Sequence, residues 1–115
     1  MEQDDAIEAF GALAQTSRIE VFRLLVRAGP DGMQVGEIAK RLNIVPSTLS
    51  GHLSVLKRSS LLKSRRNQRE IHYSANLDVV NSLVNFLLAD CCDGRLENCS
   101  EIISLLNDEG RCDGN

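Results

Sequence analysis

Residues 46–56 read PSTLSGHLSVL, and this stretch decides the fold of the chain. Its leucines, Leu49, Leu53 and Leu56, are spaced four and three residues apart, which predicts the buried side of one helix. Pro46 suits the first turn of that helix, where the N–H that proline lacks is not needed. Polar and mostly small residues lie largely away from the leucines: Ser47, Ser50, Gly51, Ser54 and Lys57.

Three helices are predicted before this segment. Apolar residues at helical spacing predict the first over Asp5–Leu13. Thr16 or Ser17 can cap the second, and Glu20 stands where a capping box requires an acidic residue. A break rich in glycine and proline follows, and a short third helix is then predicted over 35–42.

After residue 60 the apolar period changes from that of a helix to that of strands. Residues 61–65 and 70–74 are predicted strands, with Asn67-Gln68 as the turn between them. A further helix is expected over Leu77–Cys91, and Gly94 can end it. These elements predict a mainly α (α+β) fold, a winged helix-turn-helix of about five helices and a two-stranded wing hairpin.

Net charge is only −3, but its distribution is uneven. Residues 40–69 carry eight basic side chains and no acidic one, whereas residues 1–39 carry three basic and seven acidic side chains. Residues 70–115 are acidic as well, with two basic and nine acidic side chains. A basic segment of this length within a winged helix-turn-helix predicts contact with double-stranded DNA.

The predicted DNA contacts lie on the helix that starts at Pro46 and on the hairpin. Hydroxyls and N–H groups near the start of that helix can meet a phosphate or a base, and the hairpin tip can reach the backbone or the minor groove. His52 is expected to touch a phosphate and not a metal. The predicted contacts are Ser47, Thr48, Ser50, His52, Lys57, Arg65, Arg66 and Arg69.

All four cysteines fall in the last quarter of the chain, at Cys91, Cys92, Cys99 and Cys112. Thiolates are soft ligands, so the first three predict a site for a soft, thiophilic ion. Cys112 is expected to be a spare thiol. In a reducing compartment, metal binding or redox chemistry is expected before structural disulfides.

Three stretches resemble the ArsR/SmtB family of winged helix-turn-helix repressors. Residues 13–18, LAQTSR, resemble the signature that opens the second helix of that family. Ser47–Leu56 resembles its recognition helix, usually close to S-T-x-S-x-H-L-x-x-L, and 61–73 resembles its wing. The resemblance implies a homodimer joined through the first and last long helices. It also implies repression relieved by a metal or metalloid.

The resemblance also limits where the sensing site can lie in this chain. One family site uses cysteines at the recognition helix, and this chain has none there. Another uses Asp and His pairs on the last long helix, where Asp78 stands without a histidine. Cys91, Cys92 and Cys99 resemble the C-terminal site of arsenical-sensing members. Trivalent arsenic favours a three-sulfur pyramid, so three thiolates satisfy it, whereas structural zinc usually takes four ligands.

Several alternatives stay open at this point. Antimonite is an alternative inducer, and methylated arsenicals would need only two thiols. A four-thiolate zinc, cadmium or lead site would recruit Cys112, and thiol oxidation is a further alternative. From other classes, a thiol enzyme would show no salt-dependent DNA binding, and a plain protein-interaction module could be built on the same winged-helix scaffold. Ser50 and His52 have no acidic partner nearby, so no enzyme is expected.

The length of 115 residues and the apolar content of 43% fit one domain of ordinary size. Residues 1–93 are predicted to form the DNA-binding and dimerisation domain, and 94–115 a tail carrying part of the metalloid site. Apolar runs are too short to span a membrane, and the N-terminus shows no secretory signal. A cytoplasmic protein without a membrane partner is therefore expected.

Overall fold

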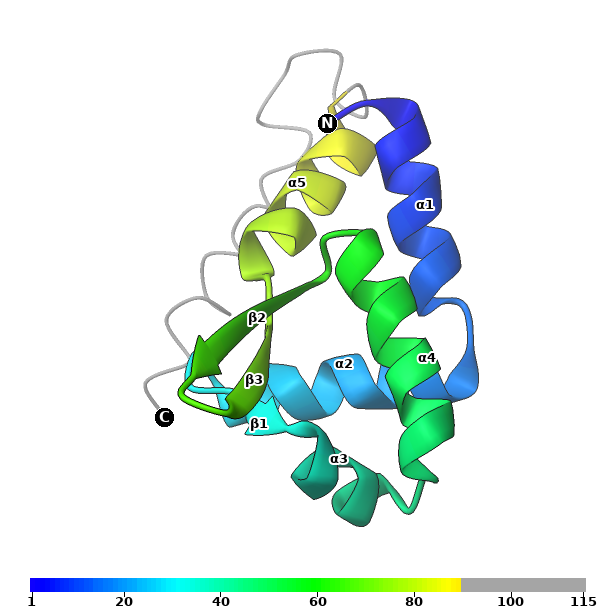
Figure 1. Ribbon diagram of the computed structural model, residues 1–115. Coiled ribbons are helices and arrows are strands. Elements are labelled where there is room, and N and C mark those ends of the chain that lie inside the picture. Colours follow the sequence, from blue (N-terminus) through cyan, green and yellow to red (C-terminus); the bar gives the residue numbers. More distant parts are fainter. Residues whose placement is uncertain (90–115) are drawn as a thin grey trace. The chain divides into compact units, whose positions relative to one another are not determined.

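The computed structural model describes residues 1–89, which form five helices and three strands (Figure 1). In chain order these are α1 (Gln3–Leu13), α2 (Thr16–Ala28), β1 (Met33–Gln34), α3 (Val35–Leu42), α4 (Pro46–Arg58), β2 (Leu62–Asn67), β3 (Glu70–Ala75) and α5 (Leu77–Leu88). Residues Met1–Leu83 form one compact unit. The predicted winged helix-turn-helix is confirmed. The expected end of the last helix at Gly94 lies outside the described residues.

Helix α4 supplies the centre of the core. Leu49, Leu53 and Leu56 are almost fully buried, as their spacing predicts. They belong to a helix that contacts α1, α2, α3 and β2. Pro46 occupies the start of α4, and Asn43 ends α3 in the left-handed conformation with φ 55°. The turn between α3 and α4 is therefore short and fixed.

Helix α1 packs through its small residues. Ala6, Ala9 and Ala12 are buried, whereas Ile7 is 59% exposed and Phe10 is 40% exposed. The helical spacing of the apolar residues is confirmed, but the larger ones face away from the core of the described chain. Such a face is unusual for an isolated surface helix.

Helix α2 differs from the prediction at its start and in its buried face. The amide of Arg18 donates to the side chain of Gln15 at 2.8 Å, so Gln15 is the cap, and the capping box expected at Ser17 and Glu20 is wrong. Spacing alone also favours a buried stripe that includes Ile19 and Val26, yet both are exposed. The buried residues are Val21, Phe22, Leu24 and Leu25.

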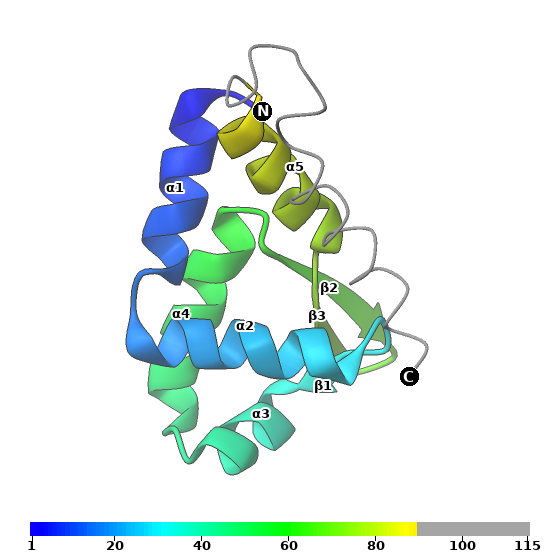
Figure 2. The same ribbon diagram turned by 180° about the vertical axis from the view of Figure 1, so that it is seen from behind.

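The wing, residues 62–75, is an antiparallel hairpin to which β1 adds a third strand (Figure 2). The predicted two-stranded hairpin is confirmed, and β1 is an addition that the sequence did not predict, because a strand of two residues is too short to show an apolar alternation. The turn residues are Gln68 and Arg69, one position later than predicted. Gln68 has a φ of 60°, and positive φ at the first loop residue is common in two-residue hairpin turns.

Gly32 makes the third strand possible. Its φ is 71°, and a Cβ atom there would collide with the carbonyl oxygen of Tyr73, the residue that pairs with Met33. Only glycine allows the chain to turn from α2 and approach β3 this closely.

Replacing Gly32 with alanine is expected to lower the free energy of unfolding by about 2 kcal/mol, because the new side chain meets both a collision and a strained φ. Urea denaturation measures this change. Gly36→Ala is the matched control, since Gly36 lies in α3 with nothing within 4 Å, and it should be neutral or stabilising by up to about 1 kcal/mol. Equal effects of the two substitutions would contradict the role given to Gly32.

Candidate nucleic-acid interface

The exposed face of α4 lies opposite its buried leucines. Successive residues on a helix are about 100° apart, so Ser47, Gly51, Ser54 and Arg58 lie farthest from the leucine side. All four are exposed. Nothing lies within 4 Å of a Cβ placed on Gly51, so no packing requirement within the described chain explains this glycine. The face is narrow, polar and open to a large partner.

The start of α4 offers unsatisfied donors. Its first intrahelical hydrogen bond runs from the amide of Leu49 to the carbonyl of Val45 at 2.9 Å, so the amides of Ser47 and Thr48 precede it. Within residues 1–89, no side chain caps this end of α4. Among residues 1–89, no partner is hydrogen-bonded to the hydroxyl of Ser47 or Thr48. Free amides at a helix start, with the positive end of its dipole, bind phosphate well.

The other predicted contacts on α4 lie toward its flanks. Ser50 and Lys57 are exposed on one flank, and His52 is half-buried on the other. Sequence reasoning did not select Ser54 and Arg58, although both share the open face with Ser47. Their position four residues apart on the side opposite the leucines is the signal that could have identified them. Which of these side chains touches DNA remains a prediction.

The wing separates the predicted arginines. Cross-strand partners share one face of a sheet, so Arg65 lies on the face of His72, and Arg66 lies on the opposite face beside Ile71. The guanidinium of Arg66 donates from Nε to the carbonyl of Gln68 at 3.1 Å. Arg69 occupies the turn itself. The three arginines are exposed and near the tip. Because Arg65 and Arg66 lie on opposite faces of the wing, the three cannot all contact the same side of a DNA groove.

The positive charge of residues 40–69 is largely uncompensated. Arg41 forms an exposed ion pair with Glu37 at 3.0 Å, which contributes little to stability. Within residues 1–89, no carboxylate lies within 4 Å of the other basic side chains of this segment. These side chains belong to α3, α4, β2 and the turn after β2. A polyanion is the partner that such a surface attracts.

The predicted metalloid ligands Cys91, Cys92 and Cys99 lie outside the described residues, as does Cys112. Within residues 1–89, no three His, Cys, Asp or Glu side chains are grouped closely enough to hold a metal ion. The metal site therefore stays a prediction from the sequence.

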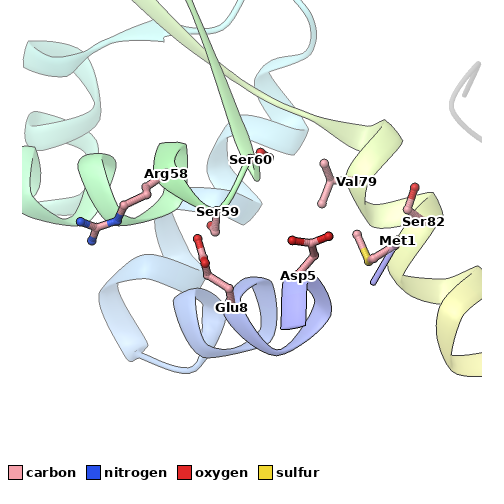
Figure 3. Close-up of a pocket in the computed structure, with 8 residues that line it drawn as sticks. All are labelled: Met1, Asp5, Glu8, Arg58, Ser59, Ser60, Val79 and Ser82. Atoms are coloured by element: carbon pink, nitrogen blue, oxygen red, sulfur yellow. The ribbon is translucent and has the colours of Figure 1, made fainter. Parts of the chain in front are cut away.

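One hollow of about 370 Å³ lies between α1, the end of α4 and the start of α5 (Figure 3). Asp5 and Glu8 line it from α1, and the guanidinium of Arg58 points away from both carboxylates (Figure 3). Two carboxylates without a third ligand in the described chain do not make a metal site. This hollow is also remote from the start of α4, so it adds nothing to the nucleic-acid interface.

Comparison with known proteins identifies a helix-turn-helix in this part of the chain. The family described as a helix-turn-helix domain matches residues 13–65, which span α2, α3, α4 and most of β2. The transcriptional repressor SdpR of Bacillus subtilis is 33% identical over 79 residues, covering 69% of this chain and 84% of SdpR. A solved structure, an ArsR-like transcriptional regulator from Rhodococcus, aligns with a TM-score of 0.69 and 26% identity, covering 86% of this chain and 92% of that one.

The chain belongs to the ArsR/SmtB family. A second solved structure agrees, the winged helix-turn-helix DNA-binding domain Mb0332 from Mycobacterium bovis, with a TM-score of 0.62 and 26% identity. That alignment covers 83% of this chain and 84% of Mb0332. This ArsR-family protein is thus a DNA-binding transcriptional regulator and not an enzyme. In the described part of the chain, no helix has the length and apolar character that crossing a membrane requires.

Replacing Lys57 with glutamine should weaken duplex-DNA binding by this ArsR-family regulator and lower the slope of log affinity against log salt by about 1, since one phosphate contact is lost. Fluorescence anisotropy at several salt concentrations measures both quantities. Arg23→Gln is the control, because Arg23 is exposed on α2, outside α3, α4 and the wing. A slope that is unchanged in Lys57→Gln would remove Lys57 from the interface.

Proposed function

We propose that this regulator is a homodimeric repressor that binds operator DNA and releases it when trivalent arsenic binds Cys91, Cys92 and Cys99. The open polar face of α4, with free amides at its start and uncompensated positive charge around it, carries the DNA half of the proposal. SdpR, the relative named a transcriptional repressor, supports repression as the direction of control.

The exposed apolar side of α1 supports the homodimer. Ile7 and Phe10 lie three residues apart on one helix, and both expose large side chains while alanines fill the core side. A second copy of the chain would cover this side. The aligned Mycobacterium bovis domain is described as homodimeric. Two-fold symmetry then places two copies of α4 on an imperfect inverted repeat with half-sites about one helical turn apart.

Replacing Ile7 with glutamate should raise the dimer dissociation constant at least about a hundredfold, because burying an unpaired carboxylate in an apolar interface costs several kcal/mol. Analytical ultracentrifugation measures the dissociation constant. Ile19→Glu is the matched control, since Ile19 is an isoleucine of α2 that is 44% exposed, and its substitution should leave the dimer intact. A dimer that survives Ile7→Glu would contradict an α1 interface.

The chemistry of the cysteines supports the arsenic half. Three soft thiolates satisfy the pyramidal geometry that trivalent arsenic prefers, and antimony shares this preference. Coupling between ligand and DNA sites is typically about 1–3 kcal/mol, which corresponds to a change in DNA affinity of roughly 5- to 150-fold. SdpR is named only as a transcriptional repressor, so the inducer is inferred from the cysteines of this chain.

Single replacement of Cys91, Cys92 or Cys99 with serine should leave operator binding intact and abolish its release by arsenite. A gel-shift titration with the DNA upstream of the protein's own gene, with and without arsenite, measures both effects. Cys112→Ser is the matched control, and it should respond to arsenite like the unaltered protein. If all three variants still release DNA, the cysteine cluster is not the sensor. Release by peroxide but not by arsenite would instead favour the thiol-oxidation alternative.

A further inference from the structure

Two hollows open between the C-terminal end of α2, the wing and the start of α5. One has a volume of about 280 Å³ and the other about 240 Å³. Pro30, Lys63 and Ala75 line both, so the two hollows adjoin, and together they are called the groove. Both views of the ribbon place the end of α2 beside the wing (Figures 1 and 2).

One end of the groove is apolar. Leu25 is fully buried beneath it, and Val26 and Leu77 stay exposed at its sides. Exposed Val26 is also one of the residues that the apolar pattern of α2 favours for burial. An apolar concave surface of this kind is the usual lining of a small-molecule site.

The other end of the groove is polar and is lined by two cationic side chains, Lys63 and Arg65. The strand register pairs Lys63 with Ser74 and Arg65 with His72, so these four side chains lie on one face of the wing. Asp31 lines this end and Asp78 lines the apolar end, but in the described chain neither carboxylate lies within 4 Å of Lys63 or Arg65.

His72 adds an unsatisfied donor or acceptor at the polar end. Its Nε2 atom is buried and has no hydrogen-bond partner within residues 1–89, and the nearby Glu70 Oε1 is 3.5 Å away. Buried polar atoms in proteins are normally satisfied, so an unsatisfied one beside a hollow points to a missing partner such as a ligand or a water molecule.

We propose that this groove binds a small organic acid with an apolar body. The carboxylate lies at Lys63 and Arg65, where charge-assisted hydrogen bonds hold it, and the apolar body lies against Val26 and Leu77. The apolar hollow, at about 280 Å³, is slightly smaller than the usual ligand pocket of about 300–1,000 Å³, which limits the apolar body to a single ring or a short branched chain.

Phenylacetate is the probe for this proposal, titrated into the full chain while the backbone amide signals are followed by NMR. Saturable shifts are expected at Val26, Lys63 and Ala75. Phenylacetamide, which keeps the ring and loses the charge, and acetate, which keeps the charge and loses the ring, should each bind at least about tenfold more weakly. No saturable binding, or equal binding of phenylacetamide, would overturn the proposal.

Lys63→Gln should weaken phenylacetate binding at least about tenfold, and Val26→Ser should weaken it without affecting the core, because Val26 is exposed. Lys40→Gln is the matched control, since Lys40 is exposed on α3 and lines neither hollow. Unchanged binding in Lys63→Gln would overturn the assignment of the polar end. Tighter binding of phenylalanine than of 3-phenylpropionate would overturn the ligand class, because a zwitterion using Asp31 or Asp78 would then be preferred.

These measurements need no DNA and no arsenite, so they are independent of the function proposed above. Where DNA binding is established, the same acid should weaken it, because a carboxylate bound at Lys63 and Arg65 reduces the positive charge of the wing. Fluorescence anisotropy measures the DNA affinity with and without saturating phenylacetate. In Lys63→Gln the DNA affinity should no longer change when phenylacetate is added. A DNA affinity unchanged by saturating acid would overturn a regulatory role for the groove.

Discussion

Burial of three leucines on one side of α4 is the constraint on which the rest of this structure depends. Leu49, Leu53 and Leu56 lie in a helix that touches α1, α2, α3 and β2, so removing any of them would open a cavity shared by several elements. The same burial fixes the rotation of α4 about its axis. Because the leucines face inward, Ser47, Gly51 and Ser54 face outward. The burial that stabilises the core therefore also sets the orientation of the proposed DNA-binding face.

A second constraint operates on α1, where the small side chains are buried and the large apolar ones are exposed. Alanines allow α1 to approach the core closely, and the larger Ile7 and Phe10 are left on the outer side. A single chain gains nothing from this arrangement, whereas a dimer buries the outer side and gains the apolar area. The proposed homodimer and the close packing of α1 therefore have the same origin in the sequence of this helix.

The wing shows how a small backbone feature changes the chemistry of a surface. Gly32 lets β1 pair with β3, and Pro30, two residues before it, lines the groove that reaches from Leu25 to Arg65. The register then gathers Lys63, Arg65 and His72 on one face. The basic side chains of the wing therefore lie beside an apolar hollow. The proposed organic acid needs both features, one for its carboxylate and one for its apolar body.

The sequence by itself determined the helices, the order of the elements and the basic segment, because helical period, proline at 46 and the absence of carboxylates over 40–69 are local properties. It also determined α3, whose predicted bounds are those observed. Only the tertiary structure decided which apolar residues are buried in α1 and α2, how the third strand joins the wing, and that Arg65 and Arg66 lie on opposite faces. These features depend on contacts between residues far apart in the chain, and local spacing carries no information about them.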